Sequence, residues 1–450
     1  MSAGGAPVVV FVIAQDRGHF GYTTHLAQAL HGAGYGVEYW SHQSAAAQCP
    51  PFASFHWLSD DQRFTSFYCR EASRLDSDAL NLRRMAATIN DLAAAEFGPL
   101  TDPMAASEGA CAGHPDRVRA LKRRLLRPDV ALCVNDCCHV FSWAGAHAER
   151  CQVPTLNLYP SQHEIQRRNA GVLDDFNSIF NNLATPSSWQ PSPEPDYEPV
   201  RTGQLPPPPS LYITYAPLIT DPALVPPGRE VIGPVYMPAD LAQQQQEELR
   251  DSELDEWLRA DPRPVVFLSL GSMVQGWDFT RDCLQCLFGG LCGERGRSAW
   301  RVLTTVAESF ARELLGDQCW DNVYFAGWVP QFAVLADPVV KVFVSHCGAN
   351  SVHESLFHGV PIVALPFFDD QRYNGRRLLE LGLASACLSK ENGKISQMEV
   401  EKAVMDAIEN VNGIRETVSH ASEELRLNPG RGLDRLLAAA KLMIYAGERV

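Results

Sequence analysis

The residues from Trp328 to Gln371 bring together side chains that can bind phosphate, hydroxyl groups and a planar ring. The hexapeptide HCGANS at 346–351 follows a mostly apolar, β-branched run from Val339 to Ser345, so we expect a buried strand, a turn and a helix. Glycine lets the backbone approach a ligand closely, and we expect Asn350 or Ser351 to cap the helix. Because a helix N-terminus attracts anions, the hexapeptide predicts a phosphate-binding turn. An ordinary strand-turn-helix with a buried histidine is the alternative.

The residues that flank this hexapeptide could bind the rest of a nucleotide. Trp328 and Gln331 precede it, and an indole stacks on a planar base while an amide hydrogen-bonds to the edge of the base. Glu354 falls in the expected helix, where its carboxylate can accept from ribose hydroxyls. The pair Asp370-Gln371 follows a second apolar run, from Pro361 to Leu365, at the strand end where open α/β sheets bind ligands. Base, ribose, diphosphate and a hydroxyl-rich group are therefore expected in order along one edge.

A candidate base lies near the start of the chain. The apolar run from Val8 to Ala14 is expected to be a strand, and a helical pattern spans Thr24 to Leu30. His19 lies between them in a glycine turn, where an imidazole can take a proton from a hydroxyl near neutral pH. His25 is the rival histidine, but we expect it inside the helix with a structural role.

A candidate partner for this histidine ends another predicted strand. The run from Pro128 to Asp136 is apolar up to its last residues, so the Asp136 carboxylate should face the same sheet edge as His19. A carboxylate bonded to one imidazole nitrogen fixes the tautomer and stabilises the imidazolium. Asp129 is the alternative acid, at the opposite end of the strand.

The segment from Trp328 to Gln371 resembles the nucleotide-sugar signature of family 1 glycosyltransferases, the UDP-glycosyltransferases of GT-B architecture. Asp337 and Ala349 depart from the plant form of that pattern. The matched positions are Trp328, Pro330, Gln331, Leu335, Pro338, Phe343, His346, Gly348, Asn350, Ser351, Glu354, Gly359, Val360, Pro361, Pro366, Asp370 and Gln371.

The resemblance implies a role for each donor-binding position. Trp328 would stack on uracil beside Gln331, and Glu354 would hold the ribose. His346, Gly348, Asn350 and Ser351 would hold the diphosphate, and Asp370 with Gln371 would hold the sugar. Ser272, in a glycine turn after the apolar run from Pro264 to Leu270, is also expected to touch phosphate.

The same resemblance implies two Rossmann-like domains facing each other across a cleft. We expect an acceptor-binding domain at 1–240, a linker helix at 241–262, a nucleotide-sugar-binding domain at 263–430, and a C-terminal helix at 431–450 that packs back on the first domain. The expected reaction is inverting transfer of a hexose from a UDP-sugar to a hydroxyl of a small lipophilic or phenolic acceptor, with glucose as the expected hexose. His19 would act as general base and Asp136 would support it. A nucleotide-sugar epimerase and a non-catalytic partner subunit are the alternatives.

Composition and charge limit the partners, the cellular location and the cofactors that we expect. The net charge of −15 argues against nucleic acid or an anionic membrane as partner, and no apolar run approaches the ~18 residues of a membrane span. The 13 scattered cysteines are typical of a reducing cytoplasm. The Asp76-Ser77-Asp78 motif and the Cys283/Cys286 pair are interpreted as a turn and as core thiols, so we expect neither a metal nor a resident cofactor, with the UDP-sugar as co-substrate.

Overall fold

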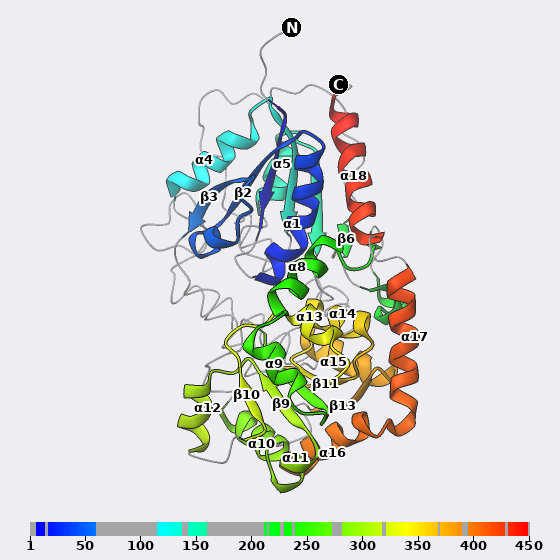
Figure 1. Ribbon diagram of the computed structural model, residues 1–450. Coiled ribbons are helices and arrows are strands. Elements are labelled where there is room, and N and C mark those ends of the chain that lie inside the picture. The colour runs from blue at the N-terminus through cyan, green and yellow to red at the C-terminus, as the bar shows by residue number, and fades with distance from the viewer. Residues whose placement is uncertain are drawn as a thin grey trace, which may run out of the picture. The chain divides into compact units, whose positions relative to one another are not determined.

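The computed structural model describes most of the chain in segments. These are residues 6–13, 17–59, 115–136, 143–159, 211–213, 216–225, 229–235, 239–271, 281–316, 321–367, 370–388, 395–427 and 431–448. The chain divides into two compact units (Figure 1). The first comprises Met1–Pro217, Asp221–Tyr236 and Gly430–Val450, and the second comprises Leu218–Thr220 and Met237–Pro429.

The first unit is built on a parallel sheet of short apolar strands. The strands are β1 (Val8–Val12), β2 (Gly36–His42), β3 (Ser54–Ser59), β4 (Val130–Asp136), β5 (Thr155–Tyr159), β6 (Leu211–Ile213) and β7 (Arg229–Val231). They run in the order β3-β2-β1-β4-β5-β6-β7, so the order reverses between β1 and β4. Ligands of open α/β sheets bind at such a reversal, next to the carboxyl ends of the two strands.

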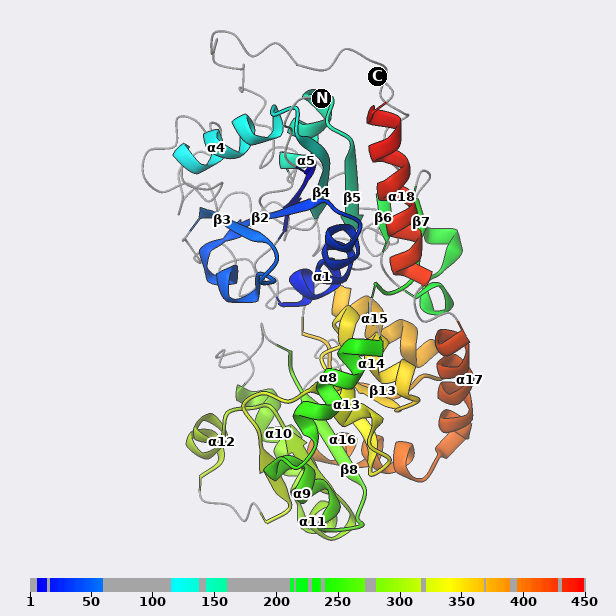
Figure 2. The ribbon, with the colours of Figure 1, turned by 45° about the horizontal axis from the view of Figure 1, so that its top comes forward.

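Helices cover both faces of this sheet. Successive side chains of a strand point to opposite faces, so the apolar strand β1 has side chains to bury on each face. On one face, Val9 and Phe11 pack with α1 (Arg17–Gly32) and α18 (Arg431–Glu448) (Figure 2). On the other face, Val10 and Val12 pack with α4 (Pro115–Leu125) and α5 (Trp143–Arg150). The C-terminal helix therefore completes the core of the first unit, as the sequence predicts.

The second unit repeats the same plan. Its strands are β8 (Val265–Ser269), β9 (Arg301–Thr304), β10 (Val323–Phe325), β11 (Val340–Ser345), β12 (Ile362–Ala364) and β13 (Ala384–Cys387). They run in the order β10-β9-β8-β11-β12-β13, all parallel, with the reversal between β8 and β11.

The second unit also has helices before, between and after these strands. They are α8 (Ala239–Leu249), α9 (Glu253–Arg259), α10 (Arg281–Leu291), α11 (Glu294–Ala299), α12 (Glu308–Leu315), α13 (Gln331–Ala336), α14 (Ala349–His358), α15 (Asp370–Glu380), α16 (Gln397–Ile408) and α17 (Ile414–Leu427). None of the helices in the described segments is long and apolar enough to cross a membrane.

Two sequence predictions of helices were wrong in detail. The charged stretch expected to be one linker helix is two helices, α8 and α9. They separate at Asp251, whose φ is 58°, and Ser252 caps α9 by accepting a hydrogen bond from Asp255 N at 3.1 Å. The first helix begins at Arg17 instead of Thr24, so His19 lies in its first turn and not in a loop.

Other sequence predictions are not tested by these segments. The Asp76-Ser77-Asp78 motif, interpreted as a turn, lies outside the described residues. The domain boundaries at 240, 262 and 430 stay predictions. The cysteines that the structure describes all have free thiols, including Cys283 and Cys286 on or beside the buried face of α10.

Two leucines of α18 test how the first unit is stabilised. Leu436 is fully buried in the core beside α1, whereas Leu442 is 69% exposed on the same helix. Leu436→Ala should lower the free energy of unfolding by about 2–5 kcal/mol, because it leaves a cavity. Leu442→Ala should change it by less than about 0.5 kcal/mol. Urea denaturation followed by circular dichroism measures both, and equal losses would contradict the packing of α18 described above.

Candidate functional site

Polar residues gather at the carboxyl ends of β8, β11 and β12, which are neighbours in the second sheet. His346 follows β11 directly, Gly271 lies two residues after β8, and Asp370 begins α15 after β12. This is the reversal point of the sheet, where parallel α/β proteins bind ligands. Ser272 lies outside the described residues, so its predicted phosphate contact stays a prediction.

The imidazole of His346 is held between two glycine residues. A Cβ atom at Gly271 would lie 2.6 Å from ring atoms Cε1 and Nε2, and one at Gly348 would lie 2.4 Å from Nε2. Any other residue at either position would have to displace the ring. Gly271 also has a φ of 72°, which disfavours side chains. The two glycines therefore fix where the histidine lies.

His346 is neutral near pH 7 in the absence of a ligand. Burial lowers the pKa of its imidazole to about 4, and this outweighs the opposing effects of Asp370 and of the Ser269 backbone. In this state the ring can act as a hydrogen-bonding group but not as a cation.

Helix α14 begins at this histidine turn. Its N-cap is Gly348, with φ −63° and ψ 148°, and no side chain caps the helix there. The expectation that Asn350 or Ser351 would be the cap was wrong, because both lie inside the first turn of the helix. The first intrahelical bond is donated by Val352 N to Gly348 O at 3.0 Å. A helix start without a side-chain cap retains backbone donors that can bind an anion.

A hydrogen-bonded group of three side chains links α13 to α14. Gln331 Nε2 donates to Ser351 Oγ at 3.2 Å and to Glu354 Oε2 at 2.6 Å. Burial raises the pKa of the Glu354 carboxyl from 4.5 to about 7, although the bond from Gln331 opposes the shift. Trp328, three residues before Gln331, has an indole that is 62% exposed. Helices α13 and α14 thus bring together Gln331, Ser351 and Glu354, three residues that the sequence singled out.

The start of α15 supplies the remaining polar pair. Asp370 and Gln371 are 7% and 6% exposed. Gln371 Oε1 accepts from Phe367 N at 3.1 Å, and Asp370 Oδ2 accepts from Asn374 Nδ2 at 3.1 Å. Asn374 also donates to Cys347 O at 2.9 Å, so it ties α15 to the histidine turn. Sequence reasoning missed Asn374, although its spacing of four residues from Asp370 on a helix was a usable signal.

A second polar pair lies in the first unit, at the reversal point of its sheet. His19 Nδ1 is 2.5 Å from Asp136 Oδ2. Asp136 ends β4 and its side chain is fully buried, whereas the His19 side chain is 22% exposed. Because a carboxylate can only accept, Nδ1–H is the donor of this bond, and in the neutral ring Nε2 is then the nitrogen that can accept a proton. The predicted contact between these two residues is therefore present.

The rival residues have other surroundings. His25 is 8% exposed, and burial lowers the pKa of its imidazole. Asp129 binds the Arg124 guanidinium, with both of its oxygens 3.1 Å from guanidinium nitrogens. The structure therefore pairs the part-exposed imidazole of His19 with the buried carboxylate of Asp136, and it does not pair His25 with Asp129.

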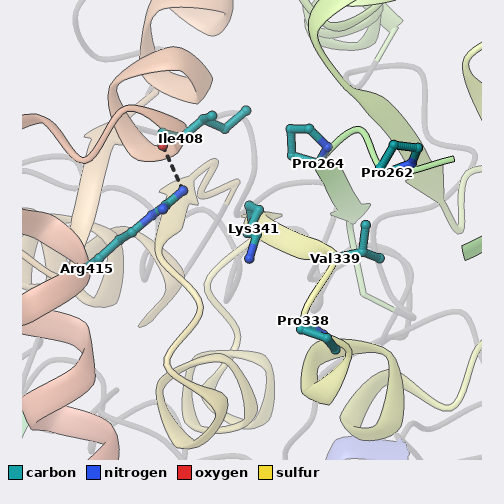
Figure 3. Close-up of a pocket in the computed structure, with 7 residues that line it drawn as sticks. All are labelled: Pro262, Pro264, Pro338, Val339, Lys341, Ile408 and Arg415. Carbon is teal, nitrogen blue, oxygen red and sulfur yellow. Dashed lines mark hydrogen bonds between the residues drawn. The ribbon is translucent and has the colours of Figure 1, made fainter. Parts of the chain in front are cut away.

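A pocket of about 390 Å³ lies elsewhere in the second unit (Figure 3). Its wall includes Pro264 and Val339, which immediately precede β8 and β11, so it lies at the amino ends of those strands. Lys341 and Arg415 also line it, and Arg415 Nη2 donates to Ile408 O at 2.7 Å. None of the site residues predicted from the sequence borders this pocket.

Part of the chain matches a known protein family. Residues 229–437 match the family model described as UDP-glucoronosyl and UDP-glucosyl transferase. The chain is 32% identical over 194 residues to anthocyanidin 3-O-glucosyltransferase 2 of Manihot esculenta, covering 39% of this chain and 55% of that protein. It is 34% identical over 195 residues to UDP-glucose flavonoid 3-O-glucosyltransferase 6 of Fragaria ananassa, covering 39% and 40%. The chain thus matches about half the length of these relatives, or less.

Solved structures resemble the whole chain. Os79 from O. sativa in complex with UDP has a TM-score of 0.62 at 17% identity and covers 97% of this chain and 100% of its own. UGT71G1 of Medicago truncatula complexed with UDP-glucose has a TM-score of 0.58 at 18% identity and covers 98% of each chain. At this identity the likeness concerns the fold, and it confirms the predicted GT-B class.

The raised pKa of Glu354 predicts a pH-dependent stability. The folded protein keeps a proton on this carboxyl between about pH 4.5 and 7, where the unfolded chain has released it. The contribution of the protonated Glu354 carboxyl to the free energy of unfolding is therefore complete below pH 4.5 and is lost as the pH rises through 7. Denaturation curves at pH 5, 6, 7 and 8 should show that Glu354→Gln reduces this decline. The control Glu424→Gln, on the exposed side of α17, should keep the wild-type profile. A profile unchanged by Glu354→Gln would contradict the shift.

Proposed function

We propose that this chain transfers a hexose from a UDP-sugar to a hydroxyl of a small lipophilic or phenolic acceptor, because residues 229–437 match the family model described as UDP-glucoronosyl and UDP-glucosyl transferase. The observation that carries the proposal is the cluster at the carboxyl ends of β8, β11 and β12. There a glycine-held histidine, an uncapped helix start and an acid-amide pair lie around one sheet edge. These are the groups that diphosphate and sugar hydroxyls need.

The nucleoside would bind along α13 and α14. The exposed Trp328 indole offers a stacking surface for uracil. With a pKa near 7, the Glu354 carboxyl can both donate to and accept from ribose hydroxyls at neutral pH. Gln331 already bonds to this carboxyl and to Ser351, so it would hold both groups in place for the nucleotide.

The diphosphate would bind at the start of α14 and against His346. Because burial and not a nearby cation lowers the His346 pKa, a bound diphosphate would raise it again. The ring would then become a better donor as negative charge develops on the leaving group. Together with the helix dipole, this contribution makes a divalent metal unnecessary in the proposal.

The sugar would bind at the start of α15. Asp370 can accept from two neighbouring hydroxyls, and the bond from Phe367 N to Gln371 Oε1 orients the Gln371 amide. Glucose is the preferred hexose in this proposal, and both curated relatives described above carry glucosyltransferase names.

His19 and Asp136 would perform the proton transfer. Nε2 of His19 takes the proton of the acceptor hydroxyl while that oxygen forms a bond to the anomeric carbon. The bond from this carbon to the diphosphate breaks on the opposite side, and UDP leaves with the electron pair, so the configuration inverts. The buried Asp136 carboxylate stabilises the imidazolium that forms.

Two other functions would leave different products. An epimerase would convert the UDP-sugar without an acceptor, and a non-catalytic subunit would release no UDP. Assays with and without acceptor therefore separate them from a transferase. A cytoplasmic location and the exclusion of nucleic acid as partner stay predictions from composition.

Replacement of the proposed base tests the mechanism. His19→Ala should lower the transfer rate by ~10² or more, because a positioned base contributes 10²–10⁴. UDP affinity should be retained. The control His31→Ala changes an exposed histidine of the same helix and should keep wild-type turnover. Near wild-type turnover in His19→Ala would overturn the assignment.

Donor and metal dependence test the remaining claims. Transfer should persist in excess EDTA and should be faster with UDP-glucose than with UDP-galactose, UDP-glucuronate or UDP-N-acetylglucosamine. A panel of phenolic, terpenoid, sterol and macrolide acceptors, with UDP release as the readout, supplies the second substrate. Activity abolished by EDTA would refute metal independence, and a faster rate with another sugar would refute the donor preference.

A further inference from the structure

Helix α13 begins without a cap of its own. Its N-cap is Pro330, which has no side-chain hydrogen-bonding group and makes no cap bond. The first intrahelical bond is donated by Val334 N to Pro330 O at 3.0 Å, so the earlier N–H groups need partners from outside the helix. The helix is only Gln331–Ala336 long, so it gains little stability from its own hydrogen bonds.

A glutamine from α8 supplies one such partner. Gln245 Oε1 accepts from Phe332 N at 3.0 Å. Gln245 belongs to a run of four glutamines, 243–246, and it is the one that is part-buried while the others are exposed. Gln243 instead donates to Glu247 on the helix surface at 2.8 Å. Helices α8 and α13 lie side by side in both ribbon views (Figures 1 and 2).

The backbone N–H of Phe332 lies next in the chain to residues that are proposed to bind the nucleoside. Gln331, the preceding residue, holds Ser351 and Glu354. Phe332 itself is 4% exposed and packs against Phe357 and His358, with ring centroids 5.3 and 4.1 Å away. Before the helix, Val329 is 2% exposed in the core. The backbone from 329 to 332 is thus anchored by two buried side chains and by the bond from Gln245.

We propose that Gln245 is a positioning residue for the nucleoside diphosphate. It touches no part of the nucleotide in this account; it fixes the start of α13 and, through it, Gln331 and the adjacent Trp328. The inference rests on the proposed function, because it assigns UDP to that surface. It goes beyond that function by giving the glutamine-rich helix α8 a role in donor affinity.

Substitutions within the glutamine run test this role. Gln245→Leu removes the acceptor, Gln245→Met does so at nearly constant length, and Gln245→Glu restores an oxygen that can accept from Phe332 N. Gln244→Leu is the matched control, because it makes the same change on the exposed side of α8. UDP affinity is measured by calorimetry. KM for UDP-glucose and kcat at saturating donor are measured by UDP release, and thermal midpoints are recorded for all variants.

The Leu and Met variants should bind UDP about fivefold more weakly, which corresponds to ~1 kcal/mol, the usual loss for a missing helix cap. KM for UDP-glucose should rise by a similar factor while kcat stays unchanged, because the lost contact affects donor binding equally in ground and transition states. Gln245→Glu and Gln244→Leu should match the wild type in both parameters, and the thermal midpoints of the Leu and Met variants should fall by only about 2–4 °C.

These measurements distinguish a failure of the proposed function from a failure of the positioning role of Gln245. A wild-type protein that does not bind UDP would overturn the proposed function and, with it, the ligand assigned here. Wild-type binding with equal affinity in Gln245→Leu and Gln245→Met would overturn the positioning role alone. Equal weakening in Gln244→Leu, or no rescue by Gln245→Glu, would also overturn it, because the effect would then belong to helix α8 as a whole.

Discussion

The imidazole of His346 occupies the space that a Cβ atom would need at residue 271 and at residue 348. This steric constraint joins two segments of the second sheet, because Gly271 follows β8 and Gly348 follows β11, and these strands are neighbours. It makes Gly348 the N-cap of α14, so the helix starts without a side-chain cap. It also holds the imidazole where burial lowers its pKa. The chemistry assigned to this edge depends on that packing.

Two titratable groups of this site favour their uncharged forms before a ligand binds. Burial acts in opposite directions on their pKa values, since it lowers the pKa of His346 to about 4 and raises that of Glu354 to about 7. Both shifts favour the uncharged form. A diphosphate would therefore meet hydrogen-bond donors and a helix dipole and not a fixed positive charge. In a chain with a net charge of −15, the proposed diphosphate site would thus rely on hydrogen-bond donors and the helix dipole.

Much of the site could be predicted from the sequence because it follows from strand ends. The apolar runs before His346, Asp136 and Asp370 indicated buried parallel strands, and parallel strands bring their carboxyl ends to one edge. The 2.5 Å contact between His19 and Asp136 follows from the same reasoning. The apolar runs do not predict the order of the strands within each sheet, and this order makes β1 and β4 neighbours.

Other features could not be predicted because they depend on tertiary contacts. Asn350 and Ser351 are good capping residues, but the glycine turn around His346 places the helix start before them. The Gln331 amide bonds to Ser351 and Glu354, which lie 20 and 23 residues away in the chain, and the sequence did not indicate these bonds; its expected contact with a base stays a prediction. Nothing in a run of four glutamines indicates that Gln245 alone reaches another helix.

Calorimetric titration of UDP into the wild type and Trp328→Ala tests the account most directly. The indole is 62% exposed, so its removal should leave the fold intact, as a melting curve would check. The account predicts that the wild type binds UDP and that the variant loses about 1–3 kcal/mol of binding free energy, the usual value for stacking on an aromatic side chain. Equal affinity of the two proteins for UDP, or no binding to the wild type, would contradict it.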